Sequence, residues 1–405
     1  MAREELICGL DIGSSQITCV VGKTDAYKDS IEVVSSSRIA CRGVIGGVVV
    51  NINETALGVK KVIEEAEEKI DAMIHDVYLG IRGSHVETVN NKGVHAILRT
   101  DKEITAEDVT SVIENAKAIP MSSDRVIIDT IPQQFQIDRQ KGVHDPTGME
   151  GNHLEVNIHI ITASSTTLNN IYKSVAQAGF SIIEPPVYGL VAVGNVVVTN
   201  EEKELGCLMV DLGGQTTGLV FYGENCIKSS KELTIGCDLI TKDISHGLKT
   251  SLLQAKEIKE RHGVAFPSML KGNENIDYIG VDGRIMKTTN RKELAEYIAS
   301  RLEELFEKIS EEIENQDITP PGIILTGGGS MLEGIDKACE KVTGIETRLG
   351  LPQGIRGPNE ITSNPAFATA IGLLKYSPGQ EETRRPGMKS ISRMPMWRKL
   401  RDMFK

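Results

Sequence analysis

The chain reads Leu10-Asp11-Ile12-Gly13-Ser14-Ser15-Gln16-Ile17-Thr18-Cys19-Val20-Val21-Gly22 near its start, and it repeats this pattern later as Val210-Asp211-Leu212-Gly213-Gly214-Gln215-Thr216-Thr217-Gly218-Leu219-Val220-Phe221-Tyr222-Gly223. Each copy consists of an apolar run, an aspartate, a tight turn rich in Gly, Ser and Thr, and a second apolar run, which predicts two strands joined by a hairpin turn. A repeat of this kind predicts a chain built from two related halves. If the halves face each other, both turns come to one cleft.

Both turns have the composition of a phosphate-binding loop. A turn of Gly, Ser and Thr residues exposes backbone N–H groups that a phosphate chain can approach without obstruction by side chains. The candidate phosphate-binding residues are Gly13, Ser14, Ser15 and Gln16 in the first turn and Gly213, Gly214, Gln215 and Thr216 in the second. Asp11 and Asp211 precede the turns, and each can hold a hydrated Mg²⁺, which prefers few carboxylates together with water and phosphate oxygens. A single such turn is usually a plain hairpin, so the prediction of a phosphate clamp depends on the pair.

A third glycine-rich turn, Thr326-Gly327-Gly328-Gly329-Ser330, follows the apolar run Ile323-Ile324-Leu325. Glycines at the end of a strand let the backbone approach a flat base or a ribose edge closely. The candidate nucleoside-binding residues are Gly327, Gly328, Gly329 and Ser330. Taken alone, this turn would predict only a tight connection between a strand and a helix.

The composition of the chain limits its function classes. With 405 residues, of which 40% are hydrophobic, the chain can bury more than one core, and strand-like runs that alternate with helical ones predict a layered α/β architecture. The net charge of −11 argues against a general nucleic-acid-binding protein, because such proteins need a basic field. The seven cysteines are scattered and form no CxxC pair, which is typical of free thiols in a reducing cytosol. The N-terminus does not resemble a signal peptide, and no apolar stretch reaches the roughly 20 residues of a transmembrane helix, so we expect any membrane contact to be peripheral.

Apolar residues recur at helical spacing in two stretches. Within residues 54–70, one helical face carries Val59, Val62, Ile63, Ala66 and Ile70. A longer helix is predicted over about 291–313, and its apolar face consists of Leu294, Ile298, Leu302, Leu305, Ile309 and Ile313.

The last residues differ from the rest of the chain in charge. Residues 377–405 hold eight Lys or Arg residues against three Asp or Glu residues, a net +5, so the remainder carries −16. The stretch 377–392 contains Pro378, Gly379, Pro386 and Gly387 among charged and hydroxyl residues, which predicts a flexible linker.

After this linker, the sequence predicts an amphipathic helix over residues 393–405. The apolar face would carry Met396, Trp397, Leu400, Met403 and Phe404, and the basic face would carry Arg398, Lys399 and Arg401. Tryptophan favours the bilayer interface, and each basic residue near anionic lipid contributes about 1 kcal/mol to binding. These properties predict a weak and reversible membrane anchor. The alternative is a tail that packs on the body of the protein or stays disordered.

The three glycine-rich turns, in this order, resemble those of the actin-like ATPase superfamily, which includes actin, DnaK-type chaperones and sugar kinases. Two helices also match, one after Glu184-Pro185-Pro186 and one in Asn364-Pro365-Ala366-Phe367-Ala368-Thr369-Ala370-Ile371-Gly372-Leu373-Leu374. The resemblance implies a two-lobed α/β fold with a duplicated ribonuclease-H-like core that binds ATP and Mg²⁺ in the cleft.

Two regions resemble the FtsA family of bacterial division proteins in particular. Residues 77–163, with Leu79-Gly80-Ile81-Arg82-Gly83 and Asp145-Pro146-Thr147-Gly148-Met149-Glu150-Gly151, resemble the inserted subdomain 1C, an SHS2-like subdomain. Residues 236–263 resemble the part that opens the subdomain over the nucleotide, and the resemblance implies adenosine contacts by Gly236 and Lys259. Two residues or pairs depart from the family pattern. Cys237 stands where the family usually has a second glycine, and Lys256-Glu257 inverts the usual order of charges.

The resemblance implies the following subdomain boundaries: 1A at 1–83, 164–200 and 365–376; 1C at 84–163; 2A at 201–230 and 318–364; and 2B at 231–317. It also implies a peripheral protein on the cytoplasmic side of the cell membrane, at the division site. Such a protein assembles into protofilaments, binds anionic lipids and other division proteins, and tethers FtsZ. Arg291 and Arg301 lie on a helix that resembles the one that meets the FtsZ C-terminal peptide, although a structural helix with solvated charges explains them equally well.

Hydrolysis of ATP needs a Gln, Glu or Asp that orients the attacking water. Residues 187–193, where several relatives place such a group, contain none. Glu184 is the remaining candidate, so we expect slow or absent turnover. Two alternatives on the same fold are a PilM-like scaffold, which would lack the tail, and a small-molecule kinase, which would need a substrate-binding Asp/Asn set and a catalytic base.

Overall fold

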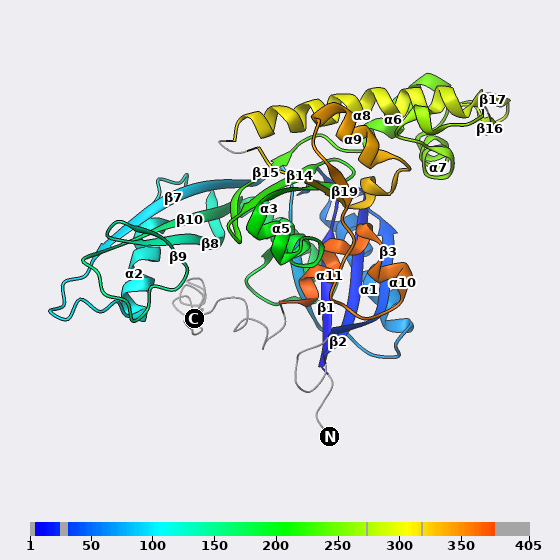
Figure 1. The fold of residues 1–405 in the computed structure, drawn as a ribbon. Coiled ribbons are helices and arrows are strands. Elements are labelled where there is room, and N and C mark those ends of the chain that lie inside the picture. The colour runs from blue at the N-terminus through cyan, green and yellow to red at the C-terminus, as the bar shows by residue number, and fades with distance from the viewer. Residues whose placement is uncertain (1–4, 25–30, 273, 317–318, 377–405) are drawn as a thin grey trace. The chain divides into compact units, whose positions relative to one another are not determined.

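The computed structural model describes residues 5–24, 31–272, 274–316 and 319–376. The predicted linker at 377–392 and the predicted helix at 393–405, with its candidate membrane residues, lie outside the described residues. The chain forms two compact units (Figure 1): the larger contains residues within 5–90, 120–133 and 159–375, and the smaller contains residues 91–119 and 134–158. Among the helices of the described part, none combines the length and the apolar character needed to cross a bilayer.

The chain alternates between strands and helices, as its sequence predicts. The strands are β1 (Glu5–Ile12), β2 (Gln16–Thr24), β3 (Ile31–Ala40), β4 (Val44–Ile45), β5 (Val48–Val49), β6 (Asp76–Ile81), β7 (Val86–Ala96), β8 (Arg125–Ile137), β9 (Gln140–Val143), β10 (His153–Ser164), β11 (Ser181–Ile182), β12 (Val187–Tyr188), β13 (Cys207–Leu212), β14 (Thr217–Gly223), β15 (Cys226–Leu233), β16 (Asn275–Ile279), β17 (Met286–Asn290), β18 (Ile323–Thr326) and β19 (Thr347–Leu349). The helices are α1 (Ile52–Glu68), α2 (Ala106–Lys117), α3 (Ser165–Gln177), α4 (Gly189–Val197), α5 (Asn200–Leu205), α6 (Asp238–Leu248), α7 (Leu252–His262), η1 (Pro267–Met269), α8 (Arg291–Glu314), η2 (Gly328–Met331), α9 (Ile335–Thr343), α10 (Asn359–Thr362), η3 (Pro365–Phe367) and α11 (Ala368–Leu374).

The larger unit contains two sheets of the same topology. In the first, β1, β2 and β3 are antiparallel neighbours, and β6 and then β11 continue the sheet in parallel from β1. In the second, β13, β14 and β15 are antiparallel neighbours, and β18 and then β19 continue it in parallel from β13. Asp11 pairs with Gly80 and Asp211 pairs with Thr326, each one residue before the end of its strand. The repeated sequence is therefore a repeated structure.

Helix α1 covers the first sheet with the apolar face that its sequence predicts, except for Ile70, which follows the helix end at Glu68 and is half-buried. It begins after Asn51, whose side chain accepts a hydrogen bond from Glu54 N and so satisfies one of the free N–H groups at the helix start. Val59, Val62, Ile63 and Ala66 are fully buried, and α1 packs on β2, β3 and α3. Full burial of one such aliphatic side chain contributes about 1.5–3 kcal/mol.

Helix α8 organises the core of the second half. It begins after Asn290, whose side chain accepts a hydrogen bond from Glu293 N at 2.8 Å. All six residues of the predicted apolar face are buried, and they join side chains of β13, β14, β18 and α6 in one core. The predicted helix over 291–313 is thus confirmed, with one more residue at its end.

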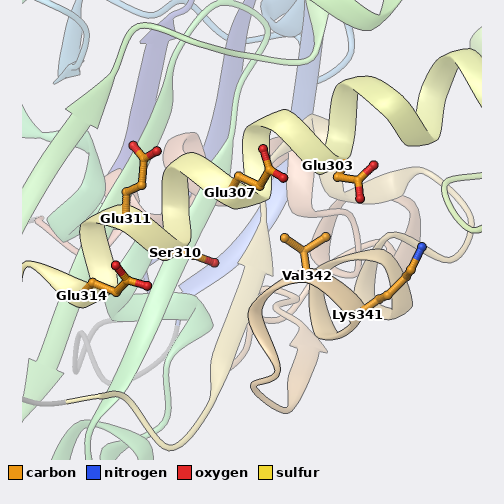
Figure 2. Close-up of a pocket in the computed structure, with 7 residues that line it drawn as sticks. All are labelled: Glu303, Glu307, Ser310, Glu311, Glu314, Lys341 and Val342. Atoms are coloured by element: carbon orange, nitrogen blue, oxygen red, sulfur yellow. The ribbon is translucent and has the colours of Figure 1, made fainter.

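The outer side of α8 borders a groove. Figure 2 shows this groove between α8 and α9. Its volume is about 460 Å³, and its lining residues are Glu303, Glu307, Ser310, Glu311, Glu314, Lys341 and Val342. Four glutamates against one lysine make the groove acidic.

The smaller unit holds α2 beside β7. Gly93 of β7 has no side chain, and a Cβ there would lie 2.2 Å from Val112 O of the helix, so a larger residue would separate the two elements. Asn91 Nδ2 donates to Ala116 O at 2.7 Å and ties the strand to the last turn of α2.

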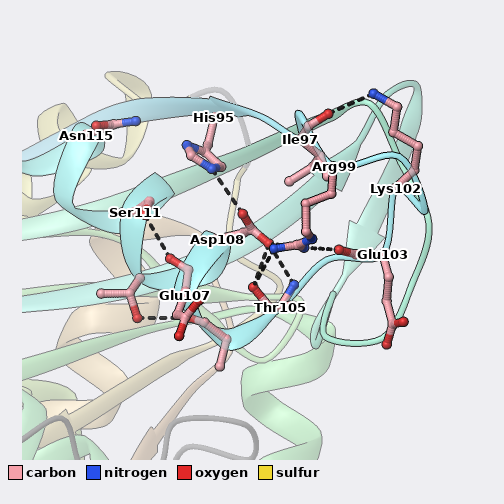
Figure 3. A network of polar contacts seen from close by, with 12 residues as sticks. His95, Ile97, Arg99, Lys102, Glu103, Thr105, Glu107, Asp108, Ser111 and Asn115 are labelled. Atoms are coloured by element: carbon pink, nitrogen blue, oxygen red, sulfur yellow. Dashed lines mark hydrogen bonds and ion pairs between the residues drawn. The ribbon is translucent and has the colours of Figure 1, made fainter.

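A network of polar contacts fixes the start of α2, as Figure 3 shows. Asp108 Oδ2 accepts hydrogen bonds from Thr105 N at 2.8 Å, Thr105 Oγ1 at 2.7 Å and Arg99 Nη2 at 2.7 Å, and Oδ1 lies 3.2 Å from His95 Nε2. Burial works against the charge of Asp108, but these hydrogen bonds lower its pKa well below the usual range. The network is a capping box extended by two further side chains.

Candidate functional site

The two repeated turns have the same backbone geometry. Gly13 N donates to Gln16 O at 3.0 Å in the β1–β2 turn, and Gly213 N donates to Thr216 O at 3.0 Å in the β13–β14 turn. Both turns therefore project from their sheets in the same way, because each follows an equivalent strand.

The two turns approach each other closely, and the first turn also reaches the second half through a hydrogen bond. Ser15 Oγ of the first turn donates to Asp238 Oδ2 at 2.6 Å, at the start of α6. A Cβ at Gly214 of the second turn would lie 1.9 Å from Ser15 Oγ, and a Cβ at Gly236 would lie 2.4 Å from Gly214 O. The close approach of the turns thus requires glycine at both positions.

A short hairpin, β4–β5, contacts both turns. Its central residues, Gly46 and Gly47, both have positive φ, at 57° and 82°, which suits a two-residue hairpin turn. Gly46 N donates to Gln215 Oε1 and Gly47 N donates to Ser14 Oγ, both at 2.9 Å. This hairpin therefore contacts both candidate phosphate loops.

The third glycine-rich turn lies beside the second. Gly327 has a φ of 81°, and a Cβ there would lie 2.2 Å from Asp211 Oδ1. Ser330 Oγ donates to Gly327 O at 2.8 Å and stabilises the turn. Thus the structure brings the turn to Asp211.

Lys259 of α7 contacts Cys237, which lies beside the second and third glycine-rich turns. Its Nζ donates to Cys237 O at 3.3 Å, and Cys237 N in turn donates to Gly213 O at 3.0 Å. A Cβ at Gly329 would lie 2.4 Å from Cys237 Sγ. Burial raises the pKa of the Cys237 thiol to about 11, and the positive charge of Lys259 opposes this shift. Cys237, which departs from the family pattern, is therefore protonated and makes an apolar contact.

The two aspartates belong to one cluster of charged groups. Arg82, directly after β6, donates from Nη1 to Asp211 Oδ2 at 2.6 Å and from Nε to Glu232 Oε1 at 3.3 Å. Burial raises the pKa of Asp11 to about 6, the positive field of Arg82 opposes this shift, and the fields of Asp211 and Glu232 add to it. Burial likewise raises the pKa of Glu232, against the field of Arg82. The charges of Arg82, Asp211 and Glu232 thus act on Asp11, while the joint role of Asp11 and Asp211 in holding a cation stays a prediction.

These residues fit a phosphate chain with a cation. Asp11 and Asp211 come from equivalent strands, the charge of Asp211 acts on Asp11, and the glycine turns beside them allow the close approach that a phosphate chain needs. A cation that binds Asp211 would meet the guanidinium of Arg82, which already contacts that carboxylate.

Comparison with known proteins gives the family. Residues 208–372 match the family described as cell division protein FtsA, and residues 83–162 match the SHS2 domain inserted in FtsA. The chain is 34% identical to cell division protein FtsA of Pseudomonas aeruginosa, over 92% of this chain and 89% of the relative. The chain belongs to the FtsA family. FtsA of Neisseria meningitidis is 35% identical over 92% of this chain and 90% of its own, and FtsA of Bacillus subtilis is 31% identical over 93% and 84%.

Solved structures confirm the predicted actin-like fold of this FtsA-family chain. A PilM-PilN type IV pilus biogenesis complex superposes with a TM-score of 0.67 at 18% identity, and covers 92% of this chain and 98% of its own. MreB5 of Spiroplasma citri bound to ADP superposes with a TM-score of 0.55 at 12% identity, over 94% and 99%. The chain is thus a cell division protein of the FtsA family with an actin-like fold and an SHS2 insertion.

Three candidate residues of this FtsA-family chain lie outside the charged cluster. Glu184 is exposed, and its charge acts on Tyr172 of α3. Arg291 donates to His262 O at 3.1 Å and to Glu333 Oε2 at 3.0 Å. Arg301 contacts both oxygens of Asp243, at 2.6 and 3.0 Å. Both arginines thus have ion-pair partners within the chain.

Five residues of the site were not identified as candidates from the sequence: Arg82, Glu232, Asp238, and Gly46 and Gly47 of the β4–β5 turn. The sequence does carry a signal for the turn, since two glycines stand between Val44-Ile45 and Val48-Val49. Arg82 and Glu232 carry no local signal, because Arg82 is a single charge after an apolar strand and Glu232 follows Lys231 within a strand of mixed polarity.

Proposed function

We propose that this FtsA-family chain binds ATP with Mg²⁺, assembles into protofilaments, and tethers FtsZ to the cytoplasmic side of the cell membrane at the division site. The observation that carries the nucleotide part is the meeting of two equivalent hairpin turns, with Asp11 and Asp211, beside a glycine turn that can take a nucleoside. The family membership supports the role in cell division.

The nucleotide would lie between the repeated turns. Asp11 and Asp211 would hold Mg²⁺ through water, and the residues Gly13 to Gln16 and Gly213 to Thr216 would contact the phosphates. Gly236, Lys259 and the residues Gly327 to Ser330 would contact the nucleoside. The bound cation would neutralise charge on the phosphate chain. Two structures of MreB5, one bound to ADP and one to AMPPNP, share the fold and support this proposal.

We expect ATP turnover to be slow or absent. Glu184, the candidate for orienting water, is exposed, and it is not among the charges that shift the pKa of Asp11. Steady-state ATP hydrolysis at the rate of a sugar kinase would contradict this expectation and would favour the kinase alternative.

The membrane contact is assigned to Met394–Lys405. One short amphipathic helix binds weakly, so stable attachment would need several copies linked in a filament. This requirement connects self-association with the tether. Subdomain boundaries follow the family pattern, with 1A at 1–83, 164–200 and 365–376, 1C at 84–163, 2A at 201–230 and 318–364, and 2B at 231–317.

The partner contact is assigned to α8 of the second half. Arg291 and Arg301 would bind acidic groups of the FtsZ C-terminal peptide, but such groups must compete with Glu333 and Asp243 of the chain itself. We therefore expect a weak peptide complex whose affinity falls with rising salt concentration.

Sedimentation with anionic vesicles tests the proposal. The full chain should sediment with vesicles more strongly with ATP and Mg²⁺ than without, and it should carry a labelled FtsZ C-terminal peptide with it. Deletion of Met394–Lys405 or the change Trp397→Glu should release it. Ser392→Glu, which adds the same charge in the linker, is the matched control and should sediment as the unchanged protein does.

Undiminished sedimentation of the deleted chain would refute the membrane anchor. Loss of the peptide alone would favour a PilM-like scaffold over an FtsZ tether.

A further inference from the structure

Arg82 connects the two halves of the nucleotide cleft. It follows β6 in the first half, and its guanidinium contacts Asp211 of β13 and Glu232 of β15 in the second half. The side chains of Asp211 and Glu232 are 4% and 1% exposed, so both carboxylates depend on this one cation for neutralisation.

The surroundings of Arg82 are shaped to hold a long side chain. A Cβ at Gly189 would lie 2.5 Å from Arg82 Cγ, and a Cβ at Gly218 would lie 2.8 Å from Arg82 Nη2. Two glycines on different elements thus make room for the arginine. Among the described residues, Arg82 Nη2 is a buried nitrogen without a hydrogen-bond partner, so one donor of the guanidinium is left for another acceptor.

We infer that Arg82 is a built-in counter-cation that competes with Mg²⁺ for the carboxylates of the cleft. This inference rests on the proposed nucleotide site. Asp11, Asp211 and Glu232 together attract a divalent cation, but the guanidinium 2.6 Å from Asp211 opposes the approach of a second cation. Binding of Mg²⁺ with a nucleotide then requires Arg82 to leave Asp211. A phosphate oxygen is a suitable acceptor for the guanidinium once it has moved, since arginine pairs well with phosphate.

Divalent-cation binding without nucleotide tests this competition. Mn²⁺ serves as the probe, and its free concentration is followed by electron paramagnetic resonance after removal of metals with EDTA. Arg82→Gln should bind one Mn²⁺ about tenfold more tightly than the unchanged chain, or tighter still, because three carboxylates are left without a counter-ion. Arg82→Gln combined with Glu232→Gln should return toward the affinity of the unchanged chain, because it lowers the negative charge again.

A matched control separates this effect from a general change of charge. Arg99→Gln removes the same charge from the smaller unit and should leave Mn²⁺ affinity unchanged. Equal Mn²⁺ affinity of Arg82→Gln and the unchanged chain would overturn the inference, as would an equal gain in Arg99→Gln.

Folding gives a second readout. Arg82→Gln should unfold at a lower temperature than the unchanged chain in EDTA, and Mn²⁺ should raise its unfolding temperature more than that of the unchanged chain. If Arg82→Gln does not fold, Arg82→Lys decides, since lysine keeps the charge but lacks the planar guanidinium fork that contacts Asp211 and Glu232 at once. A larger Mn²⁺-dependent rise in Arg82→Lys than in the unchanged chain supports the competition, and an equal rise overturns it.

The proposed function is measured separately. A fluorescent ATP analogue titrated into the unchanged chain with Mg²⁺ tests nucleotide binding. If the analogue does not bind, the nucleotide site is refuted, and the comparison of Mn²⁺ affinities still tests the role of Arg82.

Discussion

Two arginine–aspartate pairs of nearly the same length have opposite surroundings. Arg82 and Asp211 in the larger unit are 2.6 Å apart, with side chains 15% and 4% exposed. Arg99 and Asp108 in the smaller unit are 2.7 Å apart, with side chains 39% and 12% exposed. The buried pair leaves Arg82 Nη2 without a partner, whereas the oxygens of Asp108 contact Thr105, Arg99 and His95.

In the proposed function the two ion pairs have different roles, because Arg82–Asp211 belongs to the nucleotide site whereas Arg99–Asp108 holds the start of α2. Asp108 forms a helix cap, and its hydrogen bonds are complete, so it has little left to offer a ligand. The Arg82 cluster is buried, has more carboxylates than cations, and keeps a donor in reserve, which are properties of groups that rearrange around a ligand. Variants of Asp211 should therefore weaken ligand binding, whereas variants of Asp108 should destabilise the start of α2.

The largest effect is expected for Asp211→Asn. The change removes a carboxylate that would hold Mg²⁺, and loss of a charged partner is worth about 1.5–3 kcal/mol, so the affinity for ATP with Mg²⁺ should fall about 10- to 150-fold. Titration with a fluorescent ATP analogue measures this. Asp108→Asn is the matched control, and its affinity should equal that of the unchanged chain. A drop of less than threefold for Asp211→Asn would remove the distinction between the pairs.

Asp108→Ala should destabilise the smaller unit by about 2 kcal/mol, because it removes an N-terminal cap worth about 1 kcal/mol and leaves Arg99 and His95 without their acceptor. Hydrogen exchange of the α2 amides measures the loss locally, which avoids the assumption that both units unfold together. Glu107→Ala removes an exposed charge from the same turn and should have little effect. Equal exchange rates in both variants would show that the network does not hold the helix.

The pH dependence of α2 should also report Asp108. Its carboxyl has a lower pKa in the folded chain than in the unfolded chain, so its contribution is complete above the unfolded pKa of about 3.9 and is lost as the pH falls below that value. In Asp108→Asn this contribution is absent at every pH. The difference between the two proteins in the protection factors of the α2 amides, which are corrected for the intrinsic pH dependence of exchange, should therefore be large at pH 6 and should shrink in acid. A constant difference across this range would contradict the assignment.

The smallest effect is expected for His95→Gln. His95 Nε2 lies 3.2 Å from Asp108 Oδ1, and the other partners of Asp108 remain in the variant. A loss of about 0.5–1 kcal/mol, typical of one ordinary hydrogen bond, should appear in the exchange of the α2 amides. A loss as large as that of Asp108→Ala would mean that His95 carries the network, and the comparison would need revision.

Patterns formed by residues close together in the sequence predicted the hairpins and the helix faces, because these features depend on residues near each other in the chain. The two hairpins follow from an apolar run, an aspartate and a glycine turn, and the buried face of α8 follows from the helical period of residues 294 to 313. The topology of the second sheet follows from the first, because the sequence repeats.

The contacts of the cleft depend on pairs that no local pattern contains. Arg82 and Glu232 are separated by 150 positions, and Ser15 and Asp238 by 223. A lone arginine after a strand has the same sequence signal whether it faces solvent or a buried carboxylate. The exposed position of Glu184 is a similar case, since the adjacent prolines indicate a turn but not the side on which the glutamate lies.

The facing glycines under Arg82 have a consequence for how this cleft can vary. A Cβ at Gly47 would lie 2.3 Å from Arg82 O, and a Cβ at Gly83 would lie 2.5 Å from Gly46 O, so neither Gly47 of the β4–β5 turn nor Gly83 after Arg82 tolerates a larger residue. The side chain at position 82 has room, because Gly189 and Gly218 beside it carry no side chains. A single substitution there can therefore retune the electrostatic balance of the cleft in descendants of this protein while the surrounding scaffold is inherited unchanged.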